Sequence, residues 1–167
     1  FLLFCSYFYN VLGGERLGIF YHASNADLKK GDLLTIKYGK AMQHPNFYKE
    51  SEHNYAQHLR EMIFEEVRKV NFPSAPSRLD SKYLVKDLKA ALAYRKKFNI
   101  NHVYEVEIEE PGRIITADMT WIDFSSGKHY EELKMLAHNY FSEKRSENYF
   151  FETLYDGPVR VKKKVSL

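Results

Sequence analysis

Three side chains that could take part in chemistry stand out along the 167-residue chain. His22 ends the apolar run IFYH at residues 19–22, Tyr83 lies in SKYLV just before an Ala-rich segment, and Glu152 lies within YFFETL. Burying a carboxylate among aromatic side chains costs free energy unless a partner compensates the charge. Such residues are therefore candidates for a functional site. Imidazole, phenol and carboxylate groups can together bind hydroxyls, stack on a flat cation and stabilise a developing positive charge.

Each of these residues also has an ordinary structural explanation. His22 could be a hydrogen-bonded histidine at a strand end, and Tyr83 could be one packed ring among 13 tyrosines. Glu152 could lie on the polar face of an edge strand. Their occurrence together, in a fixed order, is what favours a shared function.

Several common kinds of site are missing from the sequence. It contains no GxGxxG, no Walker loop, no GxSxG and no paired-cysteine zinc spacing. The seven histidines are scattered, and His53 and His58 are five residues apart, a poor spacing for two metal ligands on a helix. We therefore expect no metal site. The single Cys5 cannot form an internal disulfide, which fits a reducing, cytoplasmic location.

The segments that carry these residues predict one α+β domain over residues 1–167, with no linker and no repeat. The clearest helix covers residues 52–70, where Tyr55, Leu59, Met62, Ile63 and Val67 form an apolar stripe. Further helices are expected over 86–98 and 129–143. Strands are expected within 1–23, over 79–85, 102–110 and 113–119, and on both sides of the Asp156-Gly157-Pro158 turn in 149–165. Residues 24–50 read as a loop because Gly31, Gly39 and Pro45 interrupt them.

The net charge and the distribution of charged residues exclude few classes of binding partner. The net charge is +3, and no apolar run is long enough to span a bilayer, so we expect no membrane partner. In the terminal RVKKKV, Val159, Val161, Lys163 and Val165 would share one strand face, and Arg160, Lys162 and Lys164 the other. The basic face is either a solvated face that protects an edge strand or a stripe that attracts phosphates.

Taken in order, these motifs resemble those of ADP-ribosyltransferases of the His-Tyr-Glu type. FYHASNADLKKGDLLT and HVYEVEIEEP are similar to segments of the rifampin ADP-ribosyltransferases, and YFFETLYDGPVRV to the Glu-containing segment of bacterial toxins that ADP-ribosylate DNA. REMIFEEVRKVNFPSAPSRLDSKYLV resembles an uncharacterised bacterial family of the same superfamily. The resemblance extends from residue 19 to about residue 165.

The resemblance implies a fold of split mixed or antiparallel sheets with flanking helices, and NAD as co-substrate. In it, His22 would bind the adenosine ribose and Tyr83 would stack on nicotinamide. Glu152 would bind the ribose 2′-OH and stabilise a transition state that resembles an oxocarbenium ion.

The neighbours of this triad supply further candidate NAD contacts. Tyr21 and Ser24 flank His22, and Ser81 precedes Tyr83 in the Ser-x-Tyr motif. Arg78 could pair with the pyrophosphate as a bidentate donor, or be a surface arginine.

Two departures from the family pattern affect these assignments. The turn after His22 is Ala23-Ser24 where the rifampin enzymes have Gly-Thr, and Ala23 lacks the conformational freedom of glycine. The rifampin enzymes also use an Asp soon after the strand matched by HVYEVEIEE. Asp118 is the nearest such residue here, so it is an alternative to Glu152 as the essential acid.

The resemblance leaves the acceptor open. We expect an intracellular toxin or phage-defence effector that modifies a macromolecule, with nucleic acid, including RNA, favoured over protein, and with an antitoxin as a conceivable partner. Aromatic residues in 46–48 and 148–151 would suit base stacking. The alternatives are an enzyme that modifies a small molecule such as an antibiotic, and a non-catalytic binding module.

Overall fold

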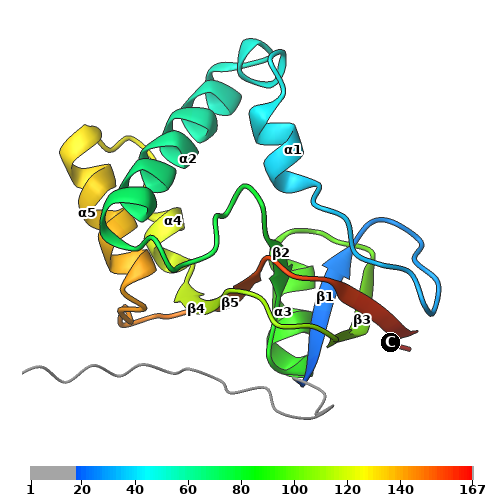
Figure 1. Ribbon diagram of the computed structural model, residues 1–167. Helices are drawn as coiled ribbons and strands as arrows, with labels where there is room; N and C mark the ends of the chain where they lie inside the picture. The colour runs from blue at the N-terminus through cyan, green and yellow to red at the C-terminus, as the bar shows by residue number, and fades with distance from the viewer. Residues whose placement is uncertain (1–17, 167) are drawn as a thin grey trace, which may run out of the picture.

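The computed structural model describes residues 18–166, and it contains two antiparallel sheets flanked by helices (Figure 1). One sheet has the order β1-β3-β6, from Ile19–Ser24, His102–Ile108 and Val159–Lys164. The other has the order β2-β5-β4, from Lys82–Leu84, Phe151–Tyr155 and Ile114–Asp118. The predicted α+β class is confirmed at this level. The strands expected within residues 1–17, and Cys5, lie outside the described residues.

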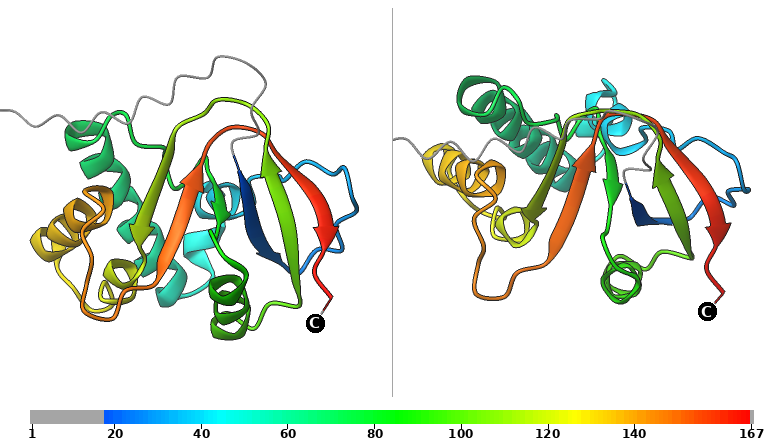
Figure 2. Two further views of the ribbon diagram at one scale, coloured as in Figure 1. Left: turned by 90° about the horizontal axis from the view of Figure 1, so that it is seen from below. Right: turned by 60° about the horizontal axis from the view of Figure 1, so that its bottom comes forward.

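The two sheets meet at a single bridge between β1 and the end of β2. Tyr21 and Val85 exchange both backbone hydrogen bonds, each 2.8 Å long. Beyond this pair the strands part, and the carbonyl of Tyr83 is contacted by the His22 side chain instead of a backbone amide. Figure 2 shows the six strands side by side in the order β4, β5, β2, β1, β3, β6. The sheet is therefore split where β1 leaves β2.

The helices pack on both sheets and on one another. They are α1 (Tyr38–Gln43), the 3-10 turn η1 (Phe47–Lys49), α2 (Glu52–Asn71), α3 (Leu88–Lys97), α4 (Thr120–Asp123) and α5 (Tyr130–Phe141). The N-caps Ser51 and Asp87 accept hydrogen bonds from Asn54 and Ala90, which fixes the starts of α2 and α3. Within residues 18–166, no helix has the length and apolar character needed to cross a membrane.

Three buried clusters form the hydrophobic core of the described residues. Phe64 of α2, Tyr140 and Phe141 of α5 and Leu154 of β5 belong to the first. The second lies mainly on the first sheet, with Tyr104, Val106 and Val159, but it also includes Leu84 of β2 and Tyr155 of β5. The third joins Val85, Ala91 of α3 and Val103 of β3. The second and third clusters therefore connect the two sheets through apolar contacts.

The predicted loop over residues 24–50 is partly wrong, because α1 and η1 lie within it. Gly39 was expected to interrupt regular structure, yet it lies inside α1. A Cβ at this position would overlap the carbonyl oxygen of Leu79, so glycine is what allows the backbone of α1 to approach residue 79. The short helix α4 was not predicted either.

The span predicted for α2 is confirmed to within one residue, and its predicted apolar stripe is partly wrong, because Val67 is buried and Ile63 packs on the core but Tyr55 and Leu59 do not. The buried residues are Glu61, Phe64, Val67 and Arg68, whereas Tyr55 is 51% exposed and Leu59 41%. The inward face was missed because it carries two charged residues, and a periodicity count assigns charged residues to solvent.

The basic terminal strand β6 is the edge of the first sheet, and its cations are paired. Arg160 contacts Glu109 at 2.6 Å, Lys162 contacts Glu107 at 2.6 Å, and Lys163 and Lys164 contact Glu105 and Asp27 at 3.1 Å. The register shifts at Lys162, which breaks the expected alternation of faces. These pairs support the edge-strand explanation over a stripe that attracts phosphates.

We expect Gly39→Ala to destabilise the protein by about 3 kcal/mol, the upper end of the usual cost of overpacking, because the new methyl group would meet backbone atoms. Urea unfolding followed by circular dichroism would measure this. The matched control, Lys40→Ala on the exposed side of α1, should stay within about 0.5 kcal/mol of the parent protein. Equal stabilities for the two variants would contradict the close approach of α1 to Leu79.

Candidate functional site

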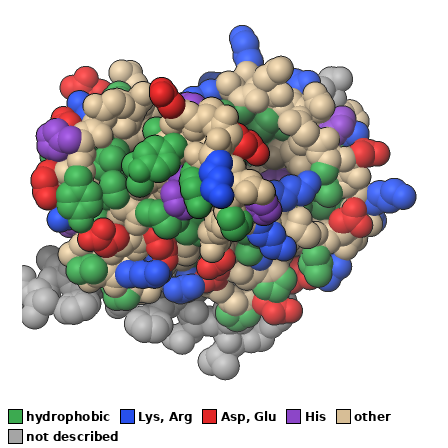
Figure 3. Space-filling view, turned by 90° about the horizontal axis from the view of Figure 1, so that it is seen from above, with side chains coloured by type: hydrophobic (Ala, Val, Ile, Leu, Met, Phe, Trp, Pro, Cys, Tyr) green, Lys and Arg blue, Asp and Glu red, His purple; other side chains and the backbone are tan. Residues whose placement is uncertain are grey.

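A cleft of about 1000 Å³ opens where the two sheets separate. His22 of β1, Tyr83 of β2 and Glu152 of β5 all line it, so segments far apart in the sequence converge at one cavity. Ser24, Arg78 and Ser81 line the same cleft, and Tyr21 and Asp118 lie outside its lining. Figure 3 shows a hollow with Lys, Arg and His side chains gathered at its edge.

His22 is held in one tautomer by the split in the sheet. Its Nδ1 lies 2.9 Å from the carbonyl oxygen of Tyr83, and a carbonyl only accepts, so Nδ1 carries the hydrogen. Burial lowers the pKa of His22, and Lys37 lowers it further, against the opposing effect of the Tyr83 carbonyl. The imidazole is therefore neutral near pH 7. Among residues 18–166 its Nε2 has no hydrogen-bond partner, so this nitrogen can accept a hydrogen bond from a ligand in the cleft.

Glu152 is buried and fixed through one oxygen. It is 2% exposed, and its Oε1 accepts hydrogen bonds from Arg78 Nη1 at 2.5 Å and from the Tyr140 hydroxyl at 2.7 Å. Both hydrogen bonds end on Oε1, and among residues 18–166 no hydrogen bond to Oε2 is found. The carboxylate is thus positioned by one oxygen and retains acceptor capacity on the other.

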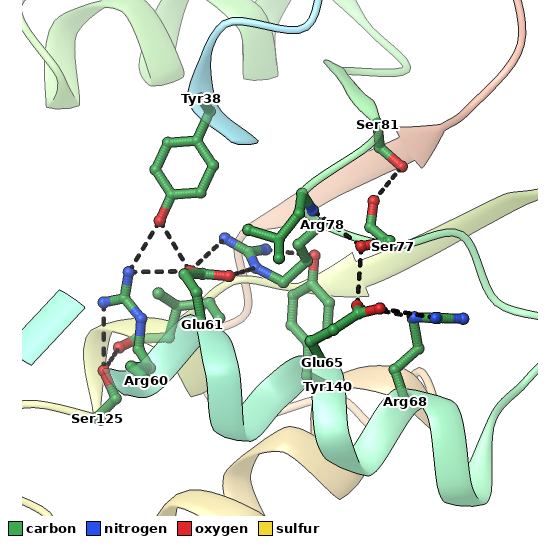
Figure 4. Close-up of polar contacts among 12 residues, drawn as sticks. Tyr38, Arg60, Glu61, Glu65, Arg68, Ser77, Arg78, Ser81, Ser125 and Tyr140 are labelled. Carbon is green, nitrogen blue, oxygen red and sulfur yellow. Dashed lines mark hydrogen bonds and ion pairs between the residues drawn. The ribbon is translucent and has the colours of Figure 1, made fainter. Parts of the chain in front are cut away.

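Arg78 is buried and connects Glu152 to helix α2, and Figure 4 shows its contact with Glu61 of that helix. Its Nε lies 3.0 Å from Oε2 of Glu61, and its guanidinium carbon lies 4.9 Å from the Tyr140 ring centroid and 5.3 Å from that of Tyr83. Burial alone would lower the pKa of Arg78, but Glu61, Tyr140, Tyr83 and Glu152 together raise it well above its usual value. The side chain is a permanent cation enclosed by carboxylates and aromatic rings.

Tyr83 is held at both ends of the residue. Its carbonyl contacts His22, and its hydroxyl donates to the carbonyl of Arg78 at 2.7 Å. The ring meets the Tyr38 ring edge-on at a centroid distance of 5.5 Å. Burial raises the pKa of Tyr83 well above its usual value, so the phenol stays neutral.

Helix α2 adds residues that sequence reasoning missed. Glu61 is 1% exposed and accepts from the Tyr38 hydroxyl at 2.8 Å and from Arg60 at 3.0 Å, in addition to Arg78. Burial raises the pKa of Glu61, but Arg78 and Arg60 outweigh it and the net pKa is lowered. The only available sequence signal was an acid next to an arginine on a helix, which is common on exposed faces.

Asp118, the alternative acid, is occupied by the local backbone. Its carboxylate accepts from the amides of Thr120 at 3.0 Å, Ser146 at 2.8 Å and Phe150 at 3.0 Å. Burial opposes its ionisation, but these hydrogen bonds outweigh burial and lower the pKa of Asp118 to about 2. Asp118 holds together the turn before β5, so the geometry favours Glu152 as the acid at the cleft.

The cleft is positively charged overall. Its lining includes five basic residues against two acidic ones, namely Lys37, Arg60, Arg78, Lys82 and Lys128 against Asp123 and Glu152. Because buried Glu61 pairs with both Arg60 and Arg78, the excess of positive charge comes from Lys37, Lys82 and Lys128. An excess of this kind attracts anionic ligands. Within residues 18–166, no group of three or more His, Cys, Asp or Glu side chains could hold a metal ion.

Arg78→Ala should destabilise the protein by about 3–5 kcal/mol, because it leaves Glu61 and Glu152 buried without their shared cation. Chemical denaturation at pH 7 would measure the loss. Lys89→Ala, at an exposed position of α3, is the matched control and should change stability by less than about 0.5 kcal/mol. A cost below about 1 kcal/mol for Arg78→Ala would argue against a fully desolvated network.

Asp118→Asn should cost about 2 kcal/mol at pH 7, from the fall of the Asp118 pKa from 3.8 to about 2 at 1.36 kcal/mol per pH unit. Because the folded-state pKa is depressed, this stabilisation is complete above about pH 4 and disappears as the pH falls toward 2. Unfolding curves at pH 7, 4 and 3 should therefore show the gap between the two proteins closing. Asp123→Asn, which alters an exposed pair with Lys97, serves as the control and should show a small cost at each pH.

Comparison with known proteins places the chain in a family without assigning an activity. No curated protein matches the sequence. The family model DUF2441, described as "Protein of unknown function", matches residues 16–166, which include all the described strands and helices. The chain therefore belongs to the DUF2441 family.

Proposed function

We propose that this chain is an NAD-dependent ADP-ribosyltransferase of an ADP-ribosyltransferase-like fold. The observation that carries the proposal is the meeting of His22, Tyr83 and Glu152 in one basic cleft. These residues come from three different strands and were singled out by their order in the sequence. The volume of the cleft, about 1000 Å³, is at the upper end of the usual range for ligand pockets, roughly 300–1,000 Å³. It is therefore large enough for a dinucleotide.

His22 and Tyr83 would position the dinucleotide. With Nδ1 engaged by the Tyr83 carbonyl, Nε2 of His22 can accept a hydrogen bond from a ribose hydroxyl of the adenosine half. The Tyr83 ring offers a flat surface to the cationic nicotinamide, which an aromatic face attracts. Ser24 lines the cleft two residues after His22, and its hydroxyl accepts from the Ala26 amide at 3.1 Å and retains its own hydrogen to donate. Ser81 already donates its hydroxyl to the Ser77 carbonyl at 2.6 Å.

Glu152 would act at the reacting carbon. The bond from the ribose C1′ to the nicotinamide nitrogen breaks, and its electron pair leaves with the nitrogen, which becomes neutral. The free oxygen of Glu152 can accept from the ribose 2′-OH and stabilise the positive charge that develops at C1′. An acceptor nucleophile then forms its bond to C1′ and releases its proton to solvent or to a nearby base.

Arg78 is better suited to holding Glu152 than to binding the pyrophosphate. Its Nε, Nη1 and Nη2 atoms already contact Glu61, Glu152 and Tyr140. Lys37, an exposed cation that lines the cleft and acts on His22, is free to take the pyrophosphate role.

For the acceptor we propose a macromolecule, with nucleic acid favoured because five basic residues line the cleft against two acidic ones. This fits a toxin or phage-defence effector. The paired cations of β6 give no support to a second basic surface on that strand.

The test is incubation of the full chain with labelled NAD and separate samples of RNA, DNA and protein extract. We expect nicotinamide release and label on nucleic acid. Glu152→Gln should lower the rate by about a hundredfold or more, because it removes charge at the developing cation while keeping the side chain's shape. The exposed Glu147→Gln is the control and should retain the parent rate.

The proposal would be overturned if the parent protein neither transferred label nor released nicotinamide. If NAD is bound but not cleaved, the chain is a binding module. Label on a small molecule alone would redirect the acceptor assignment without affecting the role of Glu152.

A further inference from the structure

We infer that one end of the cleft binds a single-stranded nucleic acid segment, with a phosphate at Arg60. This end, called the acceptor end here, lies between α2 and the α4–α5 loop and is lined by Leu59, Arg60, Ile122, Ser125, Ser126 and Lys128. The binding site itself is independent of catalysis. Its use as an acceptor site rests on the proposed function, because Glu152 lines the same cleft.

Arg60 has donors to spare. Its Nη2 donates to the Tyr38 hydroxyl at 3.1 Å and to Glu61 at 3.0 Å, which orients the guanidinium (Figure 4). Its Nη1 makes only a long contact of 3.4 Å with Ser125 Oγ, and within residues 18–166 its buried Nε has no hydrogen-bond partner. Because Nε is buried, the weakly held Nη1 is the donor that would take a phosphate oxygen in the cleft.

The charges near Arg60 favour an anion. Lys128 lines the same end, and its 3.1 Å contact with Glu132 is an exposed pair that contributes little. Asp123 is the acidic residue of this end, and Lys97 neutralises it at 2.5 Å. Glu61 contacts Arg60 at 3.0 Å, but it is shared with Arg78, also at 3.0 Å. A phosphate entering here would therefore meet cations without an uncompensated carboxylate.

Exposed apolar side chains neighbour these cations in the sequence. Phe124 is 50% exposed and directly follows the lining residue Asp123, and its ring lies edge-on to that of Trp121 at 6.0 Å. On α2, Leu59 lines the cleft, lies one turn after the exposed Tyr55 and adjoins Arg60 in sequence. Phe124 and Tyr55 are not lining residues, so they would extend the site beyond the lining. Exposed rings near cations are features that proteins use to hold single strands, because bases stack on rings whatever their sequence.

A second aromatic and basic surface is less suitable. Arg145 lies 5.7 Å from the Tyr149 ring centroid and 5.2 Å from that of Phe151, so this cation already packs on both rings. Because neighbouring side chains of a strand point to opposite faces, Phe151 faces away from Glu152. This surface serves as a matched control, since it has the same composition without access to the cleft.

The experiment is fluorescence anisotropy of the full chain with labelled single-stranded RNA and DNA of about 12 nucleotides, within the usual range of binding-site sizes. We expect binding that weakens as salt rises. Phe124→Ser and Lys128→Ala change exposed positions, and each should weaken binding about fivefold or more, as should Arg60→Gln. Arg145→Gln should change it less than twofold. Thermal melting of every variant checks folding, and if Arg60→Gln fails to fold, the two exposed variants decide.

Three results of the anisotropy experiment would overturn the inference. They are no binding of either strand at low salt, equal binding by the parent protein and both exposed variants, and loss of binding in Arg145→Gln alone. Since no NAD is present, these results are separate from a failure of NAD cleavage. A preference for RNA or for DNA would identify the source of the phosphate. Labelling of a protein, with no strand bound, would point to a different class of acceptor and also overturn it.

Discussion

The buried ion pairs of Arg78 with Glu61 and Glu152 constrain the rest of the structure. They join α2, the segment before β2, β5 and, through Tyr140, α5. Removing charges from water is costly, and the cost is offset only when every partner is in place. Helices α2 and α5 are therefore held against the second sheet in one arrangement. The same interaction that fixes α2 against the sheet also fixes the carboxylate at the cleft.

The split between the sheets follows from a single substitution of hydrogen-bond partners. After the bridge between Tyr21 and Val85, the imidazole of His22 takes the Tyr83 carbonyl, so β1 and β2 no longer pair. The sheets stay attached through apolar contacts, because two of the three buried clusters include Leu84, Tyr155 or Val85 together with residues of the first sheet. The histidine that ends the apolar run at residues 19–22 thus has a structural task, and this task leaves its second nitrogen free.

Much of the fold and part of the candidate site could be predicted from the sequence. Helical periodicity located α2 to within one residue, and strand alternation located β3, because both depend on local spacing. The order of short motifs pointed to His22, Tyr83 and Glu152, which do share a cleft. What could not be predicted depends on contacts between distant segments.

Glu61 and Gly39 show why these contacts were missed. A charged residue is assigned to solvent unless its partner is known, and the partner Arg78 lies 17 residues away. Gly39 was taken as a loop residue, since only the three-dimensional structure places Leu79 against it. Arg78 itself was noticed, but its carboxylate partners could not be identified from spacing alone.

The two-ended attachment of Tyr83 has a consequence for ligand affinity. Its main chain is bound to His22 and its hydroxyl to residue 78, so its ring orientation is set when the protein folds. A flat molecule that stacks on this ring does not have to immobilise it, and the rotational entropy of the side chain is already lost before the ligand arrives. The free energy of that contact is then available for binding in full.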